Sequence, residues 1–458
     1  MNSTQRVLLA LAAASLVAAG CSKISPLAPP TVTGGAASFG TYVAMGTSIS
    51  SGFESGGLVD RHQTQSFPYL FARQVGSPFT IPSINNDGIP ALLQLVSLSP
   101  LIVSNAGRVL GNPTNFAQPT AYNNMGIPGA ILFDVADTSY YEAGNPIGRP
   151  STMFDIIQRN RGTILAQVAS LSPSFISFEY GANEVLGPAT QGGTIPVLPS
   201  ASYGALLDGT LTGLQAACPN AHIAIVNVPD VTSIPYVTTF PPVVLGADGN
   251  PVLIGGLPIP LIGSEAGGVG PLGLGDYVLL AAADSMAIGC GFPTGTFSYV
   301  SGAPGNNRPL LDSEVLSSVE ATAISATVDG YNTAIANEAA SRGLALVDLH
   351  GLLLQAATTG YSYRGSVYTS DYITGGLFSL DGVHPTDLAH GIICNLMIDA
   401  VNRTFGSSIS PVNLSESATG SASRVRPVNG RRMLPDIQGS ERMLAPLFPW
   451  RESALTMR

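Results

Sequence analysis

The sequence predicts an α/β protein in which a mainly parallel sheet is covered by helices. Four short apolar runs have the β-branched and aromatic composition of buried strands, and stretches with helical spacing lie between them. Parallel strands that are buried on both faces are nearly continuous apolar runs, and strands that alternate with helices are typical of a layered α/β sheet. The 458 residues are 45% hydrophobic, which is enough to build a large core.

We expect the strands where β-branched or aromatic runs are bounded by Gly, Pro or Asn, at 42–45, 175–180, 223–228 and 344–349. The expected helices are 154–171, 203–217, 312–342 and 387–403. The third helix has the clearest ends, because Asp312 is a good N-terminal cap and Gly343 follows its last residue.

Two long segments, 78–122 and 229–304, are crowded with glycine and proline and interrupt this alternation. Irregular loops of this length are rare in compact domains, so we expect these insertions to form subdomains or walls over a site. In the second insertion, the apolar stretches 243–245 and 252–254 flank Asp248-Gly249, a pair that is typical of a hairpin turn.

The charge composition argues against two classes of protein. Charged residues make up only 10% of the chain, and the formal net charge is −10. Long coiled coils need abundant Glu, Lys and Arg at heptad spacing, and binding to nucleic acid needs a basic surface. We therefore expect neither a coiled coil nor a nucleic-acid partner.

The first 20 residues predict an export signal. Arg6 precedes an apolar run over 7–19, which is too short to span a bilayer of about 30 Å. The end of this run, Ala18-Ala19-Gly20-Cys21, resembles a bacterial lipobox, so we expect a lipoprotein signal peptide over 1–20 and a lipid on Cys21. That lipid would anchor the protein in the bacterial cell envelope, at the outer membrane. An ordinary secretory signal, with a secreted or periplasmic protein, is the alternative.

The composition changes again on both sides of the main domain, which we expect over 39–410. Residues 21–38 are rich in Pro, Gly, Ser and Thr and are expected to form a flexible tether. Residues 411–458 hold seven arginines and four acidic residues, and we expect a disordered basic tail there.

Beyond Cys21 the chain has three cysteines: Cys218, Cys290 and Cys394. They allow at most one disulfide, and the sequence does not choose the pair. Their spacing does not match a zinc site, so we expect them to be buried small hydrophobic residues.

Two stretches contain residues that could move a proton. Ser48 follows an apolar strand within small residues, and a sharp turn there would present its hydroxyl above the sheet edge where α/β proteins place their sites. Asp381 precedes His384 by three residues in a loop that leads into a helix, so the carboxylate could hold the imidazole while it takes a proton from a nucleophile. Each stretch alone could also be a plain turn or a helix start with a surface histidine.

Two further stretches could supply neutral hydrogen-bond donors. They are 123–129, which contains Gly126, and 181–184, which contains Asn183 and follows an expected strand. An unobstructed glycine N–H and an asparagine amide are the donors that an oxyanion pocket requires. Taken alone, each of these stretches could be only a turn.

Taken together and in this order, the four stretches resemble the conserved blocks of the SGNH branch of the GDSL hydrolase family. The resemblance spans about residues 41–404, with Gly46-Thr47-Ser48 as the first block and Asp381-Gly382-Val383-His384 in the last. It implies a three-layer α/β/α sandwich with a mainly parallel, flavodoxin-like sheet. Thr47 and Glu184 each replace the aspartate that is usual at these positions, and neither position is assigned proton transfer in the family.

The resemblance also implies the roles of the site residues. Ser48 would be the nucleophile, His384 the base and Asp381 the residue that orients it. The N–H groups of Ser48 and Gly126 and the side chain of Asn183 would hold the oxyanion. Neither a metal nor a cofactor is required for this chemistry.

The resulting hypothesis is a serine ester hydrolase, similar to esterases and lipases, that acts on a small-molecule, lipid or glycan ester. A carbohydrate O-deacetylase or an acyltransferase could use the same residues. A non-catalytic envelope binding protein that keeps the fold is an alternative from a different class. The sequence indicates no obligate protein partner.

Overall fold

The computed structural model describes residues 32–98, 101–137, 152–417, 436–438, 440, 443, 444 and 447. Its centre is a five-stranded sheet in which every neighbouring pair is parallel. The strands, in spatial order, are β13 (Ala345–Val347), β6 (His222–Val226), β5 (Phe175–Glu179), β1 (Tyr42–Gly46) and β4 (Asn124–Gly126). Numbered along the chain this order is 2-1-3-4-5, the flavodoxin-like arrangement. The predicted α/β fold is confirmed.

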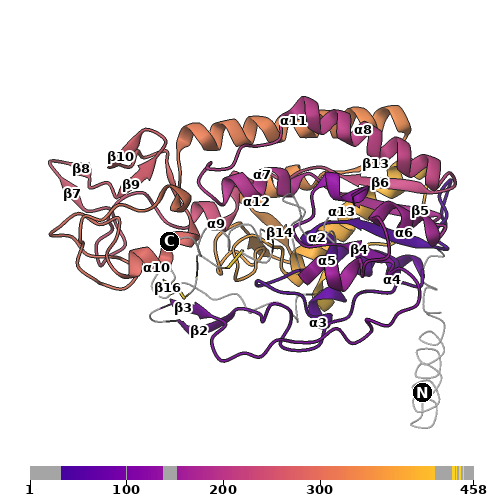
Figure 1. Cartoon of the computed structure of the whole chain (residues 1–458), viewed down its shortest axis with the longest axis horizontal. Coiled ribbons are helices and arrows are strands. Elements are labelled where there is room, and N and C mark those ends of the chain that lie inside the picture. The colour runs from indigo at the N-terminus through magenta and orange to yellow at the C-terminus, as the bar shows by residue number, and fades with distance from the viewer. Residues whose placement is uncertain are drawn as a thin grey trace, which may run out of the picture.

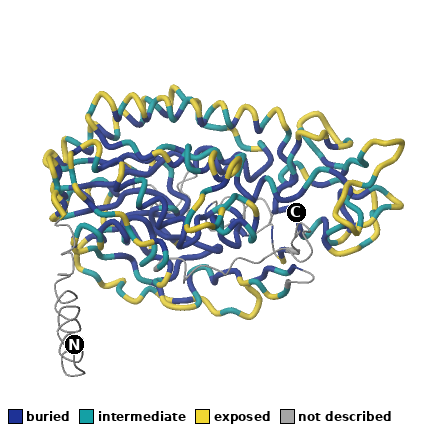
Figure 2. Tube along the Cα trace, turned by 180° about the vertical axis from the view of Figure 1, so that it is seen from behind, coloured by how far each residue is buried: buried dark blue, intermediate teal, exposed yellow. Residues whose placement is uncertain are grey.

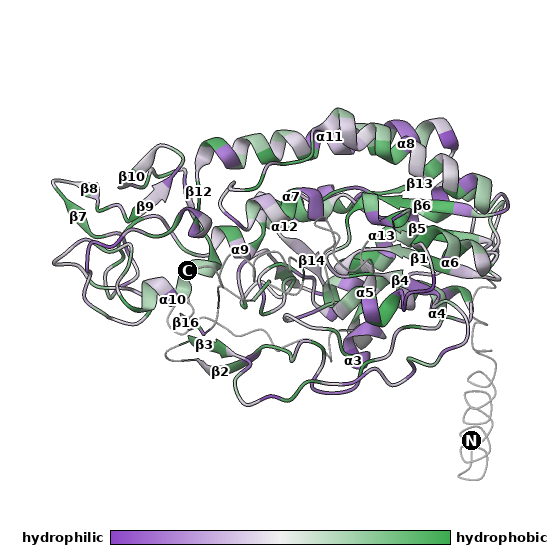
Figure 3. Cartoon of the chain, viewed as in Figure 1, coloured by the Kyte–Doolittle hydropathy of each residue, from purple (hydrophilic) through white to green (hydrophobic). Residues whose placement is uncertain are grey.

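Helices cover both faces of the sheet and complete three layers (Figure 1). Val43 and Met45 of β1 pack with α6 (Ile164–Ser170), α8 (Ser200–Ala217) and α11 (Ser318–Arg342). The alternate residues Tyr42 and Ala44 pack with α4 (Phe67–Val75) and α13 (Asp387–Phe405) on the opposite face. Because successive side chains of a strand point to opposite faces, strands covered on both sides are apolar at most positions. The burial in Figure 2 and the hydropathy in Figure 3 follow this pattern along the sheet.

All four expected strands are present, within a few residues of their expected ends. The fifth strand, β4, has only three residues and was not among them. It pairs with β1 through Asn124, Met125 and Gly126. A stretch this short with polar and glycine ends has no apolar run from which to predict it.

Two expected helices have different boundaries. The stretch 154–171 forms two helices, α5 (Thr152–Ile157) and α6, because Arg159 and Asn160 have positive φ angles of 57° and 51° and end the first one. The expected helix 312–342 begins instead at Ser318, after a turn of 3-10 helix, η5 (Asp312–Glu314), and the strand β12 (Val315–Leu316).

Ser317, not Asp312, caps α11, since its hydroxyl accepts the Glu320 N–H in a capping box. The expected end at Gly343 is confirmed, with a φ of 65° that favours glycine. The remaining two expected helices correspond to α8 and α13.

The two insertions form small elements of their own. The first contains the antiparallel pair β2 (Gln94–Leu98) and β3 (Leu101–Ser104). The second projects from one end of the sandwich (Figure 1). Leu245 and Pro251 form an antiparallel bridge around the predicted turn at Asp248-Gly249, which is confirmed.

The elements of the second insertion are η3 (Val231–Ser233), α9 (Pro235–Thr238), β7 (Leu253–Ile254), β8 (Leu257–Pro258), β9 (Ile262–Glu265), β10 (Gly268–Pro271), β11 (Tyr277–Val278), η4 (Leu280–Ala282) and α10 (Ala283–Ala287). The remaining elements are α2 (Ser48–Ser51), α3 (Asp60–Gln63), η1 (Leu132–Val135), α7 (Ala182–Ala189), α12 (Leu349–Thr358), β14 (Tyr361–Tyr363), β15 (Ser366–Tyr368), α14 (Leu414–Ser417) and β16 (Asp436–Ile437).

The described residues at both expected flexible ends make contacts with the main domain. Within the expected tether, the Ala36 N–H donates to Phe405 O at 2.8 Å and Ala37 is buried, so its last residues belong to the folded domain. In the expected disordered tail, β16 pairs in parallel with β3, and several side chains of the described residues are buried. The signal peptide 1–20 and Cys21 lie outside the described residues.

The described residues also settle two smaller points. Cys218, Cys290 and Cys394 are buried free thiols, so these three form no disulfide with one another. A search of the described helices found none with the length and apolarity needed to cross a membrane.

Candidate active site

Ser48 lies at the carboxyl edge of the sheet, where β1 turns into the short helix α2. The chain order of the strands reverses direction at β1, since β4 lies on one side of it and β5 on the other. Open α/β sheets place their ligand sites at such a switch point, outside the carboxyl ends of the strands. Ser48 is the first residue of α2 and is buried.

A buried carboxylate holds the turn that carries Ser48. Glu179, the last residue of β5, accepts hydrogen bonds from the Thr47 N–H at 2.9 Å and from the Ser50 N–H at 3.3 Å. It also accepts the Thr47 hydroxyl at 2.9 Å and the Ser50 hydroxyl at 2.9 Å. Burial raises the pKa of Glu179, and these hydrogen bonds partly offset that effect. The role of Glu179 was not predicted from the sequence, because its partners are far from it along the chain.

The Asp381–His384 pair forms as predicted. His384 Nδ1 lies 2.8 Å from Asp381 Oδ2, and both side chains are buried. Asp381 Oδ1 accepts the N–H groups of Val383 and His384, each at 2.9 Å. Burial acts to raise the pKa of Asp381, but the charge of His384 and these hydrogen bonds outweigh it and hold the pKa below its usual value.

This pairing determines which imidazole nitrogen is left for chemistry. A carboxylate accepts the proton of Nδ1, so the other nitrogen, Nε2, presents its lone pair. Nε2 is buried and has no hydrogen-bond partner among the described residues. A buried polar atom without a partner is costly in a folded protein, and such an atom often marks a site of function.

The segment that begins at Ser48 packs against the loop that carries His384. The Phe53 N–H donates to Ser48 O at 3.1 Å, and the Phe53 ring lies 4.7 Å from the imidazole, centroid to centroid. The Gly56 N–H donates to Asp381 Oδ2 at 2.9 Å. The structure therefore places the serine turn beside the Asp–His pair, although the Ser48 hydroxyl does not hydrogen-bond to Nε2 in this state.

Asn183 lies in the first turn of α7, directly after β5. Its Nδ2 donates to Ala130 O at 2.7 Å, which uses one of the two amide protons and leaves the other. Gly181 caps this helix with a φ of 118°, and a Cβ there would lie 2.6 Å from Val228 Cγ2. The glycine therefore allows α7 to begin close to the sheet edge.

The Gly126 N–H, one of the expected oxyanion donors, is already paired in the structure. This group donates to Asn124 Oδ1 at 3.0 Å, and a Cβ on Gly126 would lie 2.6 Å from Ser51 N. Gly126 thus permits β4 to approach α2. Gly129, three residues further on, precedes the carbonyl that Asn183 contacts, and within the described part of the chain its N–H makes no hydrogen bond. The Ser48 N–H is likewise without a partner among these residues.

A second buried polar group lies next to this site. Ligand atoms of Glu54, His62 and Asp387 come within 4.8 Å of one another, and the three side chains could hold a metal ion. The Arg61 Nε–H donates to His62 Nε2 at 3.2 Å, so the proton of His62 is on Nδ1, which faces Asp387 Oδ1 at 2.9 Å and Glu54 Oε2 at 3.3 Å. Burial and the neighbouring Asp387 raise the pKa of Glu54 well above its usual value.

His62 and Asp387 are therefore hydrogen-bonded, and Glu54 lies against them with its Oε2 unpaired among the described residues. This group was not predicted from the sequence. Its one sequence signal is that Asp387 follows His384 by three residues in the first turn of α13.

A scan against protein-family models found no match, and a search of curated proteins also found none. Among solved structures, the chain is similar to a protein of Parabacteroides merdae described as a GDSL-like lipase. The identity is 12% and the TM-score 0.33, over 79% of this chain and 96% of that one. For a phospholipase A1 of Streptomyces albidoflavus, the identity is 13% and the TM-score 0.32, over 80% and 100%.

An extracellular lipase of Streptomyces rimosus gives 15% identity and a TM-score of 0.32, over 79% of this chain and 98% of that one. Because the TM-scores and identities are low, these likenesses carry no argument about activity.

Proposed function

We propose that the protein is a serine ester hydrolase in which Ser48, His384 and Asp381 act as a catalytic triad. The observation that supports this proposal is the buried Asp381–His384 pair. Its Nε2 has no partner among the described residues, and its imidazole packs against Phe53, in the segment that begins at Ser48. In structures without substrate, the hydrogen bonds of a catalytic triad are often long and tighten only when substrate binds. The missing Ser48–His384 hydrogen bond is therefore compatible with this role.

In the proposed reaction, His384 Nε2 takes the proton of the Ser48 hydroxyl as its oxygen attacks the ester carbonyl carbon. The tetrahedral intermediate collapses to an acyl-enzyme, and the alcohol leaves with the proton from His384. Water then attacks the acyl carbon while His384 takes a proton from it. The carboxylic acid is released, and Ser48 is regenerated with the proton that His384 returns. Asp381 stabilises the imidazolium that forms in each half of the reaction.

The oxyanion of the intermediate needs donors that are not already in use. We propose the N–H groups of Ser48 and Gly129 and the second amide proton of Asn183. Gly129 replaces Gly126 in this proposal because the Gly126 N–H is bonded to Asn124. Preorganised donors of this kind stabilise the negative charge that develops in the transition state.

The test is covalent labelling with an alkyl fluorophosphonate, together with hydrolysis of a p-nitrophenyl ester. Wild type should be labelled at Ser48, and Ser48→Ala should lose both labelling and hydrolysis. Ser51→Ala is the matched control, because Ser51 lies in the same short helix and only donates to Ser48 O, at 2.8 Å. Substantial hydrolysis by Ser48→Ala would refute the triad.

The two other functions considered from the sequence are outcomes of the same experiments. An O-deacetylase or acyltransferase would also be labelled at Ser48, and mass analysis of acetylated sugars and of acylated sugar acceptors would distinguish it from a simple esterase. A binding protein without catalysis would remain unlabelled in every variant.

We also propose that a lipid on Cys21 anchors the protein in the bacterial envelope. The supporting observation is the lipobox-like sequence that ends at Cys21. Expression in a bacterial host and fractionation would test it. Wild type should be found in the membrane fraction, and Cys21→Ala in the soluble fraction. Equal partitioning of the two would refute the anchor.

A further inference from the structure

The proposed catalytic centre is closed in this structure. The exposed fractions are 2% for Ser48, 0% for Asp381, 1% for His384 and 4% for Asn183. An ester must reach the Ser48 hydroxyl, so part of the protein around these residues must give way before substrate binds.

Three buried apolar side chains, Phe53, Leu186 and Tyr236, lie next to the centre and are attached to the catalytic residues. We call the space between them, which other side chains fill in this structure, the cleft. Phe53 packs on the imidazole of His384. Leu186 lies on α7, three residues after Asn183. The Tyr236 N–H donates to the carbonyl of Gly382, within the loop of the Asp–His pair, at 2.9 Å. All three walls are buried members of one hydrophobic cluster.

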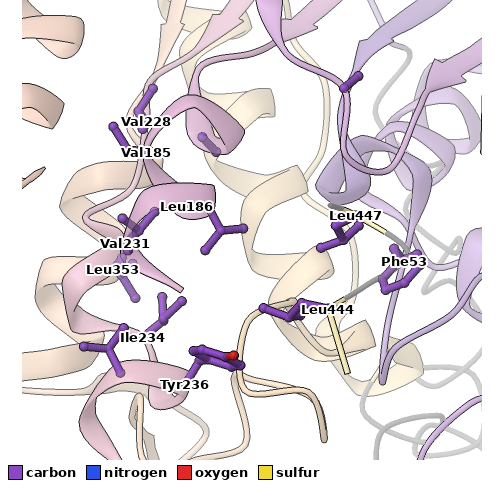
Figure 4. Packing of buried hydrophobic residues seen from close by; sticks show 14 of the residues in the cluster. Phe53, Val185, Leu186, Val228, Val231, Ile234, Tyr236, Leu353, Leu444 and Leu447 are labelled. Carbon is purple, nitrogen blue, oxygen red and sulfur yellow. The ribbon is translucent and has the colours of Figure 1, made fainter. Parts of the chain in front are cut away.

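Two leucines of the C-terminal segment fill this cleft. Leu444 and Leu447 are 0% and 1% exposed, and Figure 4 shows their side chains between Phe53 and Leu186. Their main chains form a turn in which the Leu447 N–H donates to Leu444 O at 3.0 Å. A Cβ on Gly129 would overlap the Leu447 carbonyl oxygen, so the segment lies directly against the loop of the proposed oxyanion donor.

The described hydrogen bonds that join this segment to the rest of the chain go to β3, η4 and α10. The two-residue strand β16 pairs with β3, and the Ser440 hydroxyl donates to Ala281 O at 2.9 Å. The core sheet does not include β16. Displacing the described residues of the segment therefore breaks no strand pairing of the core sheet, whereas displacing Phe53 or α7 would disturb the catalytic residues themselves.

We propose that the cleft formed by Phe53, Leu186 and Tyr236 is the acyl-binding subsite, and that Leu444 and Leu447 occupy it in competition with the acyl chain of the substrate. This inference rests on the proposed ester hydrolysis and deepens it. The ligand class is an apolar acyl chain long enough to replace two leucine side chains. Acetyl esters do not need the subsite and depend less on displacement of the segment.

The test compares two fluorophosphonate probes, one with an ethyl and one with a dodecyl chain, on the full chain and on the full-length variant Leu444→Ser/Leu447→Ser. When a protein's own side chains occupy a site, only the minor fraction of molecules with the site open can bind the probe. The apparent affinity for the probe falls in proportion to that fraction. The variant should therefore raise the labelling rate by the dodecyl probe at least about tenfold, with a much smaller change for the ethyl probe. Gln438→Ala, an exposed position in the same segment, is the matched control and should behave as wild type.

Each result decides the inference. An unchanged or smaller ratio of dodecyl to ethyl labelling in the double variant, with Ser48 still labelled, refutes the acyl subsite while the proposed hydrolase stands. A complete lack of labelling in wild type and variants refutes the hydrolase, and the subsite with it. A chain ending at residue 435 should show the same rise in dodecyl labelling as the double variant. If this truncated chain kept a cooperative thermal transition but lost labelling by the ethyl probe, the segment would be a required part of the site and not a competitor of the substrate.

Discussion

The buried carboxylate of Glu179 is expected to determine both the stability of the Ser48 turn and the rate of the proposed reaction. Glu179→Ala removes the acceptor of two main-chain N–H groups and two hydroxyls. The hydroxyls of Thr47 and Ser50 can rotate toward other acceptors, but their N–H groups cannot. Each buried donor left unpaired costs about 1–3 kcal/mol, so the two N–H groups together should cost about 2–6 kcal/mol.

Glu179→Gln should be much milder, because the amide oxygen can accept the same two N–H groups while the Thr47 hydroxyl accepts from the new NH₂ group. We expect a loss of about 1 kcal/mol for this variant. Turnover of a p-nitrophenyl ester should fall about 100-fold in Glu179→Ala, since small misplacements of a reacting group have effects of this size.

Urea unfolding measures the stability change, and steady-state kinetics measures the change in turnover. Glu338→Ala is the control for loss of a carboxylate. Glu338 pairs with Arg342 at a partly exposed position of α11, and an ion pair near the surface contributes about 1 kcal/mol or less. If Glu179→Ala cost no more than this control and kept normal turnover, Glu179 would not be the residue that holds the serine turn.

Three further outcomes are expected. Asn183→Ala should lower kcat on a p-nitrophenyl ester by about 10²–10³, the usual cost of one oxyanion donor, and an unchanged kcat would remove Asn183 from the pocket. Burial lowers the pKa of His390 to about 4, below the ordinary 6.5, so its contribution to stability is present above pH 6.5 and is lost as the pH falls toward 4. In urea titrations at pH 7 and pH 4.5, His390→Leu should lose less stability on acidification than wild type, and equal losses would contradict this. The pKa of Glu54 is raised by burial and by Asp387, so its contribution is present below the usual 4.5 and is lost as the pH rises through the raised pKa. Glu54→Gln should therefore show a smaller fall in Tm between pH 5 and pH 8, and a fall as large as that of wild type would exclude this role.

The strands show why much of the fold could be predicted. Strands of a parallel sheet that is covered on both faces are apolar at most positions, and β1, β5, β6 and β13 show this directly in their sequences. The strand β4 gives no such signal, because its three residues owe their conformation to pairing with β1. The start of α11 was misplaced for a related reason. Asp312 and Ser317 are both good caps, and pairing of Val315–Leu316 with β11 in the second insertion excludes the earlier start.

The candidate site divides in the same way. Asp381 and His384 are three residues apart, so their contact was predictable from one turn of chain. Glu179, which holds the serine turn, was not predictable, and neither was the choice of Gly129 over Gly126. Glu179 accepts from residues that are distant along the chain and follow the neighbouring strand. The choice between the two glycines depends on the Asn124 side chain, which turns onto the Gly126 N–H in the folded strand.

By itself, the sequence determined the α/β class and the places of four strands, and it identified a serine, a histidine and an aspartate as candidates for acyl transfer. These properties follow from local residue types and their spacing, which the chain carries before it folds. Only the tertiary structure decided which amides remain free for an oxyanion, which carboxylate supports Ser48, and that Leu444 and Leu447 lie in the cleft beside His384. These features depend on burial and on contacts between segments that are distant along the chain. Composition alone did not predict that the C-terminal segment buries leucines, because those contacts form only against the folded domain.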